Sequence, residues 1–259
     1  MLLLLVIANA FLHSEESPLN PMAAAAERTQ SKPGARFTME ATYSSDALPQ
    51  PMTAHATGAY NAETGLSKIL MTMNVPGKGP MTMDMVGNGT DLYMRMDGID
   101  QQLPDGKEWL EIQPFGGHSE EEMTIGSGDA DDSLQVLGLV SDGVREVGRE
   151  KVRGVSTRRY RAAIEMGEIV ELYRSEGKDE LADKVEEEAA AMTVEASIDA
   201  KSIVRRFRMV MTMPTGPGQP GLTMDMRMDL FGFGARPEVT LPDSSQVYDA
   251  TDFADEQFD

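Results

Sequence analysis

The sequence predicts an α+β fold in which helices cover one face of a highly curved antiparallel sheet. Apolar residues alternate with polar ones over most of the 259 residues, as in strands that have one wet face. Turn signals rich in Gly, Pro and Asn separate these runs. Helical patterns stand at the beginning and in the middle of the chain only, so we expect one long meander with its helices inserted at one point.

The first residues indicate a leader followed by a helix. Residues 2–7 are an apolar run, and Ala8-Asn9-Ala10 matches the small-x-small pattern of a signal-peptidase site. We therefore interpret residues 1–16 as the remnant of an export signal, with an ordinary buried segment as the alternative. A helix should follow, because Pro21 suits a first turn, four alanines come next, and Pro33-Gly34 is a stop signal.

The remaining elements follow in chain order. Strands are predicted over 36–43, 52–60, 66–75, 81–86, 91–96 and 106–112, then over 144–152, 155–166, 192–199, 202–213 and 221–234, with a short last strand within 239–247. Helices are predicted over 131–143 and 167–191. Asn88-Gly89 marks a hairpin between two of the strands.

Methionine recurs at every second residue in two stretches, residues 71–96 and 209–228. Period two places these side chains on one face of the sheet together with neighbouring aromatic residues. The candidate ligand-cavity residues are Phe37, Met39, Met71, Met73, Met83, Met85, Met94, Met96, Phe207, Met209, Met211, Met213, Met224, Met226 and Met228.

Three interpretations of this methionine face stay open. It is an ordinary core, an adaptable apolar surface for a ligand such as an acyl chain, or a Cu(I) site made of soft thioethers. The copper interpretation is weakened by the three histidines, His13, His55 and His118, because all of them lie outside both runs. So many methionines spread over five strands favour an extended surface.

Motifs for catalysis and metal binding are missing. The chain has no cysteine, which excludes thiol catalysis, zinc-thiolate sites and disulfides. Residues 129–140 begin like a calcium loop, but Leu134 replaces its glycine and Val140 its glutamate. We predict no catalytic residue, no metal site and no cofactor.

Charge excludes another class of partner. The net charge of −20 would repel phosphate backbones, so nucleic acid is not an expected partner. Two basic clusters, at 158–161 and 205–208, either offset the acidic surface or form a rim for an anionic headgroup. Residues 248–259 form an acidic C-terminal tail, to which we assign no function.

Three segments together resemble the bacterial envelope lipoproteins related to LppX and LprG. They are "NGTDLYMRM" with the following "GKEWLEI", then "REKVRGVSTRRYRAAIEM", and finally "MTVEASIDAKSIVRRFRM". The resemblance covers residues 18–247 and includes the wider superfamily of the carrier LolA. It implies a strongly curved half-barrel, helices on its concave face, and an apolar cavity that binds acyl chains.

One departure concerns anchoring, because those lipoproteins carry a lipobox cysteine and this chain has none. We therefore expect residues 17–247 to form a lipid-binding half-barrel of an exported, non-enzymatic protein, whether it acts as carrier or sensor. It would be a monomer that binds lipid or another long apolar ligand, with a membrane donor or acceptor protein as a further partner. A Cu(I)-binding envelope protein and a structural or interaction protein are the alternatives.

Overall fold

The computed structural model describes residues 20–75, 77, 79–88, 91–98, 103, 104, 106–112, 137, 143–164, 167, 170, 174, 191–213 and 221–249. The elements are α2 (Pro21–Gln30), β1 (Gly34–Ser44), β2 (Met52–Asn61), β3 (Leu66–Val75), β4 (Gly79–Gly87), β5 (Leu92–Met96), β6 (Trp109–Ile112), β7 (Arg145–Val152), β8 (Val155–Ile164), β9 (Ala191–Asp199), β10 (Val204–Met213), β11 (Leu222–Phe231), the 3₁₀ helix η4 (Ser244–Gln246) and β12 (Val247–Asp249).

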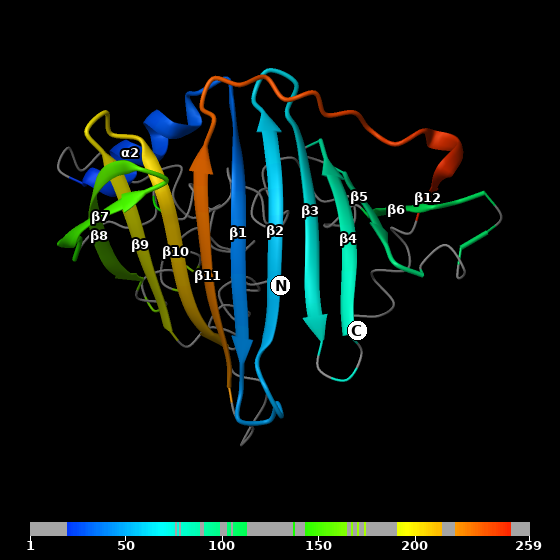
Figure 1. Ribbon diagram of the computed structural model, residues 1–259, viewed down its shortest axis with the longest axis horizontal. Helices are drawn as coiled ribbons and strands as arrows, with labels where there is room; N and C mark the ends of the chain where they lie inside the picture. The colour runs from blue at the N-terminus through cyan, green and yellow to red at the C-terminus, as the bar shows by residue number, and fades with distance from the viewer. Residues whose placement is uncertain are drawn as a thin grey trace.

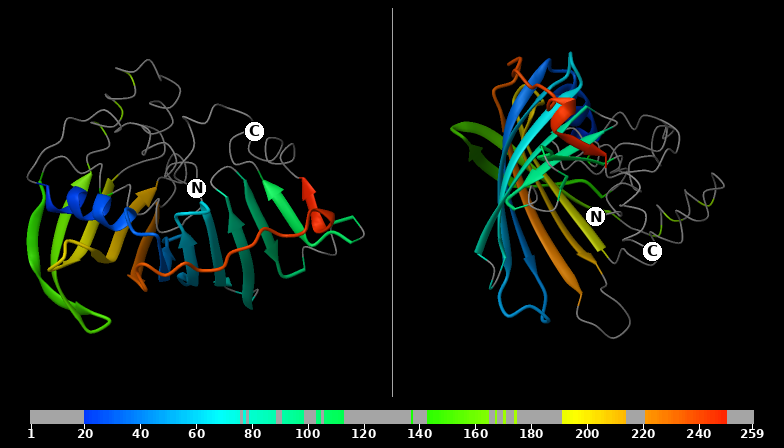
Figure 2. Two further views of the ribbon diagram at one scale, coloured as in Figure 1. Left: turned by 90° about the horizontal axis from the view of Figure 1, so that it is seen from above. Right: turned by 90° about the vertical axis from the view of Figure 1, so that its right-hand side faces the viewer.

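The twelve described strands form one sheet in the order β12-β6-β5-β4-β3-β2-β1-β11-β10-β9-β8-β7. The sheet is curved and unclosed, so β7 and β12 are its two edges (Figures 1 and 2). Antiparallel pairs of consecutive strands run from β1 to β6 and from β7 to β11, and the pairing of β1 with β11 joins these two runs in the centre of the sheet. The predicted curved sheet and half-barrel shape are confirmed.

The last strand corrects two details of the prediction. Part of residues 239–247 forms η4 instead of a strand, because the Asp243 side chain accepts hydrogen bonds from the backbone N–H and the hydroxyl of Ser245 at 2.9 and 2.7 Å. The strand β12 then pairs parallel to β6, with Val247 opposite Trp109, so the sheet is mixed and not wholly antiparallel. Tyr248 and Asp249, which the sequence assigns to the tail, belong to this strand.

The helix α2 forms where the sequence predicts it. The Asn20 side chain caps it by accepting the N–H groups of Met22 and Ala23 at 2.9 and 3.2 Å, and Pro21 opens it. Thr29 is completely buried, and its hydroxyl accepts the backbone N–H of Val204 at 3.0 Å. This bond fixes the end of α2 against the start of β10.

Helices over the sheet are described in part. The apolar side of α2 belongs to the same hydrophobic cluster as the sheet. Leu137 and Val170, which lie in the two other predicted helices, are helical and buried in that cluster. The rest of both helices is outside the described residues, apart from Gly143, Gly167, Arg174 and Ala191. The leader, His13, His118, the loop at Asp129 and residues 250–259 also lie outside them. In the described part of the chain, no helix combines the length and apolar character that crossing a membrane requires.

The hairpin between β9 and β10 shows how a polar residue stabilises the fold locally. The Asp199 carboxylate accepts the N–H groups of Lys201 and Ile203 at 2.8 and 3.1 Å and the Arg205 guanidinium at 2.8 Å. Burial alone would raise the pKa of Asp199, but these hydrogen bonds lower it below the ordinary value. Ser202 completes the turn with a φ of 57°.

Candidate ligand-binding face

Strand register places the methionines in rows that cross the sheet. The register of neighbouring strands is continuous from β5 to β9. One row consists of Met96, Met83, Met71, Ala56, Met39, Met228, Phe207 and Ala196, and the next of Met81, Met73, Ala54, Ala41, Met226, Met209 and Val194. Because opposite residues of paired strands point to the same side, these side chains share one face, which we call the methionine face.

One half of the methionine face is completely covered. This covered half consists of β1, β9, β10 and β11, where Met209, Met211 and Met228 are at most 2% exposed. Phe37 and Phe207 are likewise buried there, together with Met39, Met224 and Met226. Tyr43 lies at the end of one row, opposite Met224, and burial raises the pKa of its hydroxyl.

The other half of the face is partly open to solvent. This open half consists of β3, β4 and β5. Its partly exposed methionines are Met71, Met73, Met81, Met83, Met94 and Met96, whereas Met85 is buried. Met71, Met73 and Met94 pack against the buried core cluster from its edge. The apolar rows therefore extend beyond the part of the face that the fold covers.

The structure brings the candidate residues onto one face, as period two predicts. Met213 belongs to β10 opposite Leu222, and its side chain is outside the described residues. Four described methionines of this surface are absent from the candidate set, namely Met22, Met52, Met81 and Met192. Met192 of β9 lies opposite Met211 and is 1% exposed, and Met22 reaches the same cluster from α2. Met81 lies within the first methionine run. The other three stand outside both runs, so only the alternation of β2 and β9 pointed to Met52 and Met192.

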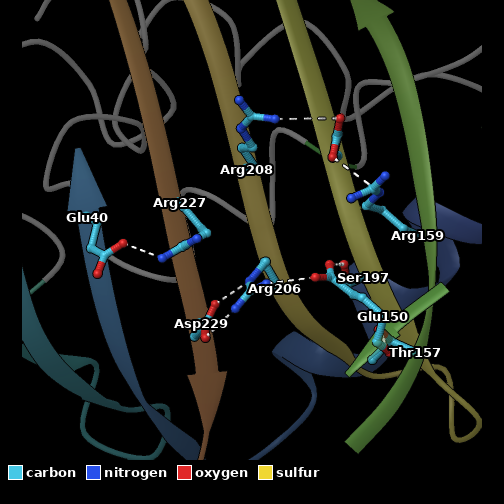
Figure 3. Close-up of polar contacts among 10 residues, drawn as sticks. Glu40, Glu150, Thr157, Arg159, Ser197, Arg206, Arg208, Arg227 and Asp229 are labelled. Carbon is cyan, nitrogen blue, oxygen red and sulfur yellow. Dashed lines mark hydrogen bonds and ion pairs between the residues drawn. The ribbon is translucent and has the colours of Figure 1, made fainter. Parts of the chain in front are cut away.

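The opposite, polar face of the covered half carries a network of ion pairs (Figure 3). Arg206 donates two hydrogen bonds to Asp229 at 2.6 and 2.8 Å and one to Glu150 at 2.8 Å. Arg208 binds Asp225 through two bonds at 2.9 and 2.8 Å, which is the chief cause of the lowered pKa of Asp225. Arg227 pairs with Glu40 of β1.

A groove of about 330 Å³ lies among these charged side chains. Glu195, 7% exposed, lies within 4 Å of three arginines, Arg159, Arg161 and Arg208. The four arginines that line the groove all have carboxylate partners. This pairing agrees with the interpretation that the two basic clusters offset acidic charge. The groove is on the face opposite the methionines.

Within the described residues, imidazole and carboxylate ligands are not gathered at the methionine face. His55 is exposed on the polar face, opposite Glu40, as its place in the alternation predicts. Within the described ranges, no group of three or more His, Cys, Asp or Glu side chains is placed to hold a metal ion. Met73, Met81 and their neighbours thus present thioethers to an apolar surface.

No protein-family model matches this chain, and no curated protein matches it in sequence. Among solved structures it is similar to LprF from Mycobacterium bovis, with 14% identity over 89% of this chain and 99% of that one and a TM-score of 0.43. It is also similar to the Mycobacterium tuberculosis lipoprotein LppX, with 11% identity over 88% and 100% and a TM-score of 0.47. A third is a putative outer membrane lipoprotein-sorting protein domain from Vibrio parahaemolyticus, with 12% identity over 84% and 92% and a TM-score of 0.33. LppX belongs to the group of lipoproteins that the sequence motifs resemble, and its similarity to this chain is one of fold at low identity.

Proposed function

We propose that this chain is an exported, non-enzymatic protein that binds the acyl chains of a lipid, or a similar long apolar molecule, in a cavity lined by the methionine face. One observation carries the proposal. The rows of apolar side chains continue without interruption from the buried covered half to the partly exposed open half. A core that served packing alone would end where its cover ends.

Burial of a ligand against the open half would supply ample free energy. Each methylene removed from water contributes roughly 0.8 kcal/mol, so one fatty chain offsets the cost of its own ordering. The side chains of Met71, Met83 and Met96 are opposite one another on three strands. Because methionine is unbranched and polarisable, such a row can repack around chains of different length or branching.

The remaining parts of the proposal follow from the sequence. Residues 1–16 act as an export signal, residues 17–247 form the lipid-binding unit, and the protein works as a monomeric carrier or sensor in the cell envelope or after secretion. A membrane protein would deliver or accept the ligand.

Substitution of neighbouring residues on β3 tests the site. Met71 lies on the methionine face, and the adjacent Leu70 is 47% exposed on the polar face, opposite Asp84. Met71→Asp should reduce the uptake of a fluorescent fatty acid at least about tenfold, because the new carboxylate loses its water when ligand covers it. Leu70→Asp is the matched control and should leave uptake unchanged. Equal behaviour of the two variants would refute the proposed site.

A second experiment separates lipid from copper. The protein, purified without detergent, is measured by native mass spectrometry together with metal analysis. We expect a lipid-sized adduct and no stoichiometric metal. Combined replacement of Met83, Met85, Met211 and Met226 by Leu keeps the surface apolar but removes sulfur, so uptake of the fatty acid should persist. Copper that is bound by the native chain and lost from this variant would favour the metal alternative.

A further inference from the structure

We infer that the partly exposed methionines of the open half are sites of reversible oxidation by peroxides, and that their oxidation lowers the affinity for the apolar ligand. The second statement rests on the proposed function. The sites are Met71, Met73, Met81, Met83, Met94 and Met96. They belong to three adjacent strands, so the oxidised surface would be continuous.

Accessibility divides the methionines of one face into two classes. Oxidation of a thioether requires that the oxidant reach the sulfur, and solvent reaches the side chains of the open half. In the covered half, Met192, Met209, Met211 and Met228 are between 0 and 2% exposed. The chain has no cysteine that would compete for the oxidant. Peroxide should therefore oxidise the methionines of the open half well before the buried methionines of the covered half.

The chemistry is a two-electron transfer from sulfur to hydrogen peroxide. The sulfur lone pair attacks one peroxide oxygen, a sulfur–oxygen bond forms, and the oxygen–oxygen bond breaks. The second oxygen leaves as water after taking up the proton of the first, so the methionine becomes its sulfoxide. A thiol-dependent methionine sulfoxide reductase reverses the step, with oxidation of two thiols to a disulfide.

The surroundings of these sulfurs explain why oxidation would matter for binding. Met71 is opposite Met83 on one side and Ala56 on the other, and Met94 is opposite Met85. A sulfoxide in such a row places a polar S=O group against thioether and methyl groups. Water solvates that oxygen in the free protein, but an acyl chain laid over the row would remove the water without replacing its hydrogen bonds.

The test combines site-resolved oxidation with ligand uptake on the full chain. The protein is treated with graded hydrogen peroxide, and peptide masses locate each added oxygen. We expect oxygen at the six open-half methionines before Met192, Met209, Met211 and Met228. At that stage the affinity for the fluorescent fatty acid should fall at least about tenfold, and two methionine sulfoxide reductases, one for each sulfoxide epimer, should together restore it.

A variant with the six open-half methionines replaced by Leu is the control. Its affinity for the fatty acid, measured first without peroxide, should not change on treatment with peroxide, and circular dichroism establishes that the variant is folded. Oxidation of buried and open methionines at equal rates would overturn the inference, as would unchanged affinity after all six are oxidised. If untreated protein takes up no fatty acid, both the proposed function and the inferred loss of affinity are overturned. The inferred order of oxidation is tested separately, by the peptide masses alone.

Discussion

The two halves of the methionine face have the same residue pattern and different surroundings. On β10 and β11 the methionines are buried in one hydrophobic cluster with residues of α2, Leu137 and Val170. On β3, β4 and β5 the same period-two pattern leaves methionines partly exposed. Period two therefore determines which face a side chain occupies, whereas the elements packed on that face determine whether the side chain is core.

The boundary between the halves lies on β2, which contributes small residues to the rows. Ala56 and Gly58 stand where both flanking strands carry larger side chains, and Ala54 lies between Ala41 and Met73. A methyl group on Gly58 would lie 2.2 Å from Cζ of Phe37, so the Phe37 ring extends over β2.

The largest difference between the halves should appear in stability. Phe207→Ala removes a fully buried ring from the covered half and should cost about 3–5 kcal/mol of the free energy of unfolding. Met83→Ala removes a partly exposed side chain and should cost about 1 kcal/mol. Urea unfolding of both variants measures the two losses of unfolding free energy. Similar losses would mean that the two halves do not differ in packing.

A substitution at the boundary should have the next largest effect. Gly58→Ala forces the Phe37 ring and the backbone oxygen of Lys68, which is 2.7 Å from the added methyl, to move. Overpacking of this kind costs about 2 kcal/mol. The double variant with Phe37→Leu should lose less than the sum of the two single changes. Strict additivity in the same unfolding measurement would show that the ring does not lie against Gly58.

Ion pairs on the polar face should follow the same division more weakly. The Arg206 side chain is 21% exposed and binds Asp229 and Glu150. The Arg95 side chain, behind the open half, is 45% exposed, and its closest contacts to Asp84 and Glu108 are longer, at 3.2 and 3.4 Å. Arg206→Gln should therefore cost about 1 kcal/mol and Arg95→Gln less than about 0.5 kcal/mol. Urea unfolding measures both costs, and a larger loss of unfolding free energy for Arg95→Gln than for Arg206→Gln would contradict this prediction.

The smallest predicted effect is a pH dependence at the hairpin of the covered half. The pKa of Asp199 is lowered in the folded protein, so its contribution to stability is complete above the unfolded value of about 3.9. That contribution is lost as pH falls through the lower, folded value. Asp199→Asn should consequently be less stable than the native chain at neutral pH, and the difference should shrink below pH 4. A constant difference across pH would contradict the lowered pKa.

Local pattern was sufficient to predict most strands and α2. Alternation from Phe37 to Tyr43 and from Met224 to Met228 is confirmed residue by residue in the pairing of β1 with β11. The predicted position of the last strand was wrong because this strand spans only Val247–Asp249, which is too short to show a period. Its parallel partner β6 is also far away in sequence.

The division into covered and open halves could not be predicted from the sequence. Met83 and Met226 have the same kind of neighbours along the chain, and only the elements packed on the sheet distinguish them. The partners in the ion pairs could not be predicted for a related reason. The partner of Arg206 is Asp229 because β10 and β11 pair in one particular register, which alternation alone leaves undetermined.

The central position of β1 has a consequence for how the chain acquires its structure. One neighbour of β1 is β2, next in sequence, but the other is β11, where Arg36 pairs with Phe231. During synthesis, the first strand must wait for almost the last one before the sheet can be completed. Pairing over such a long separation is slow, because the entropy of loop closure is lost before the contacts form. The sheet therefore stays incomplete until the synthesis of the chain is nearly finished.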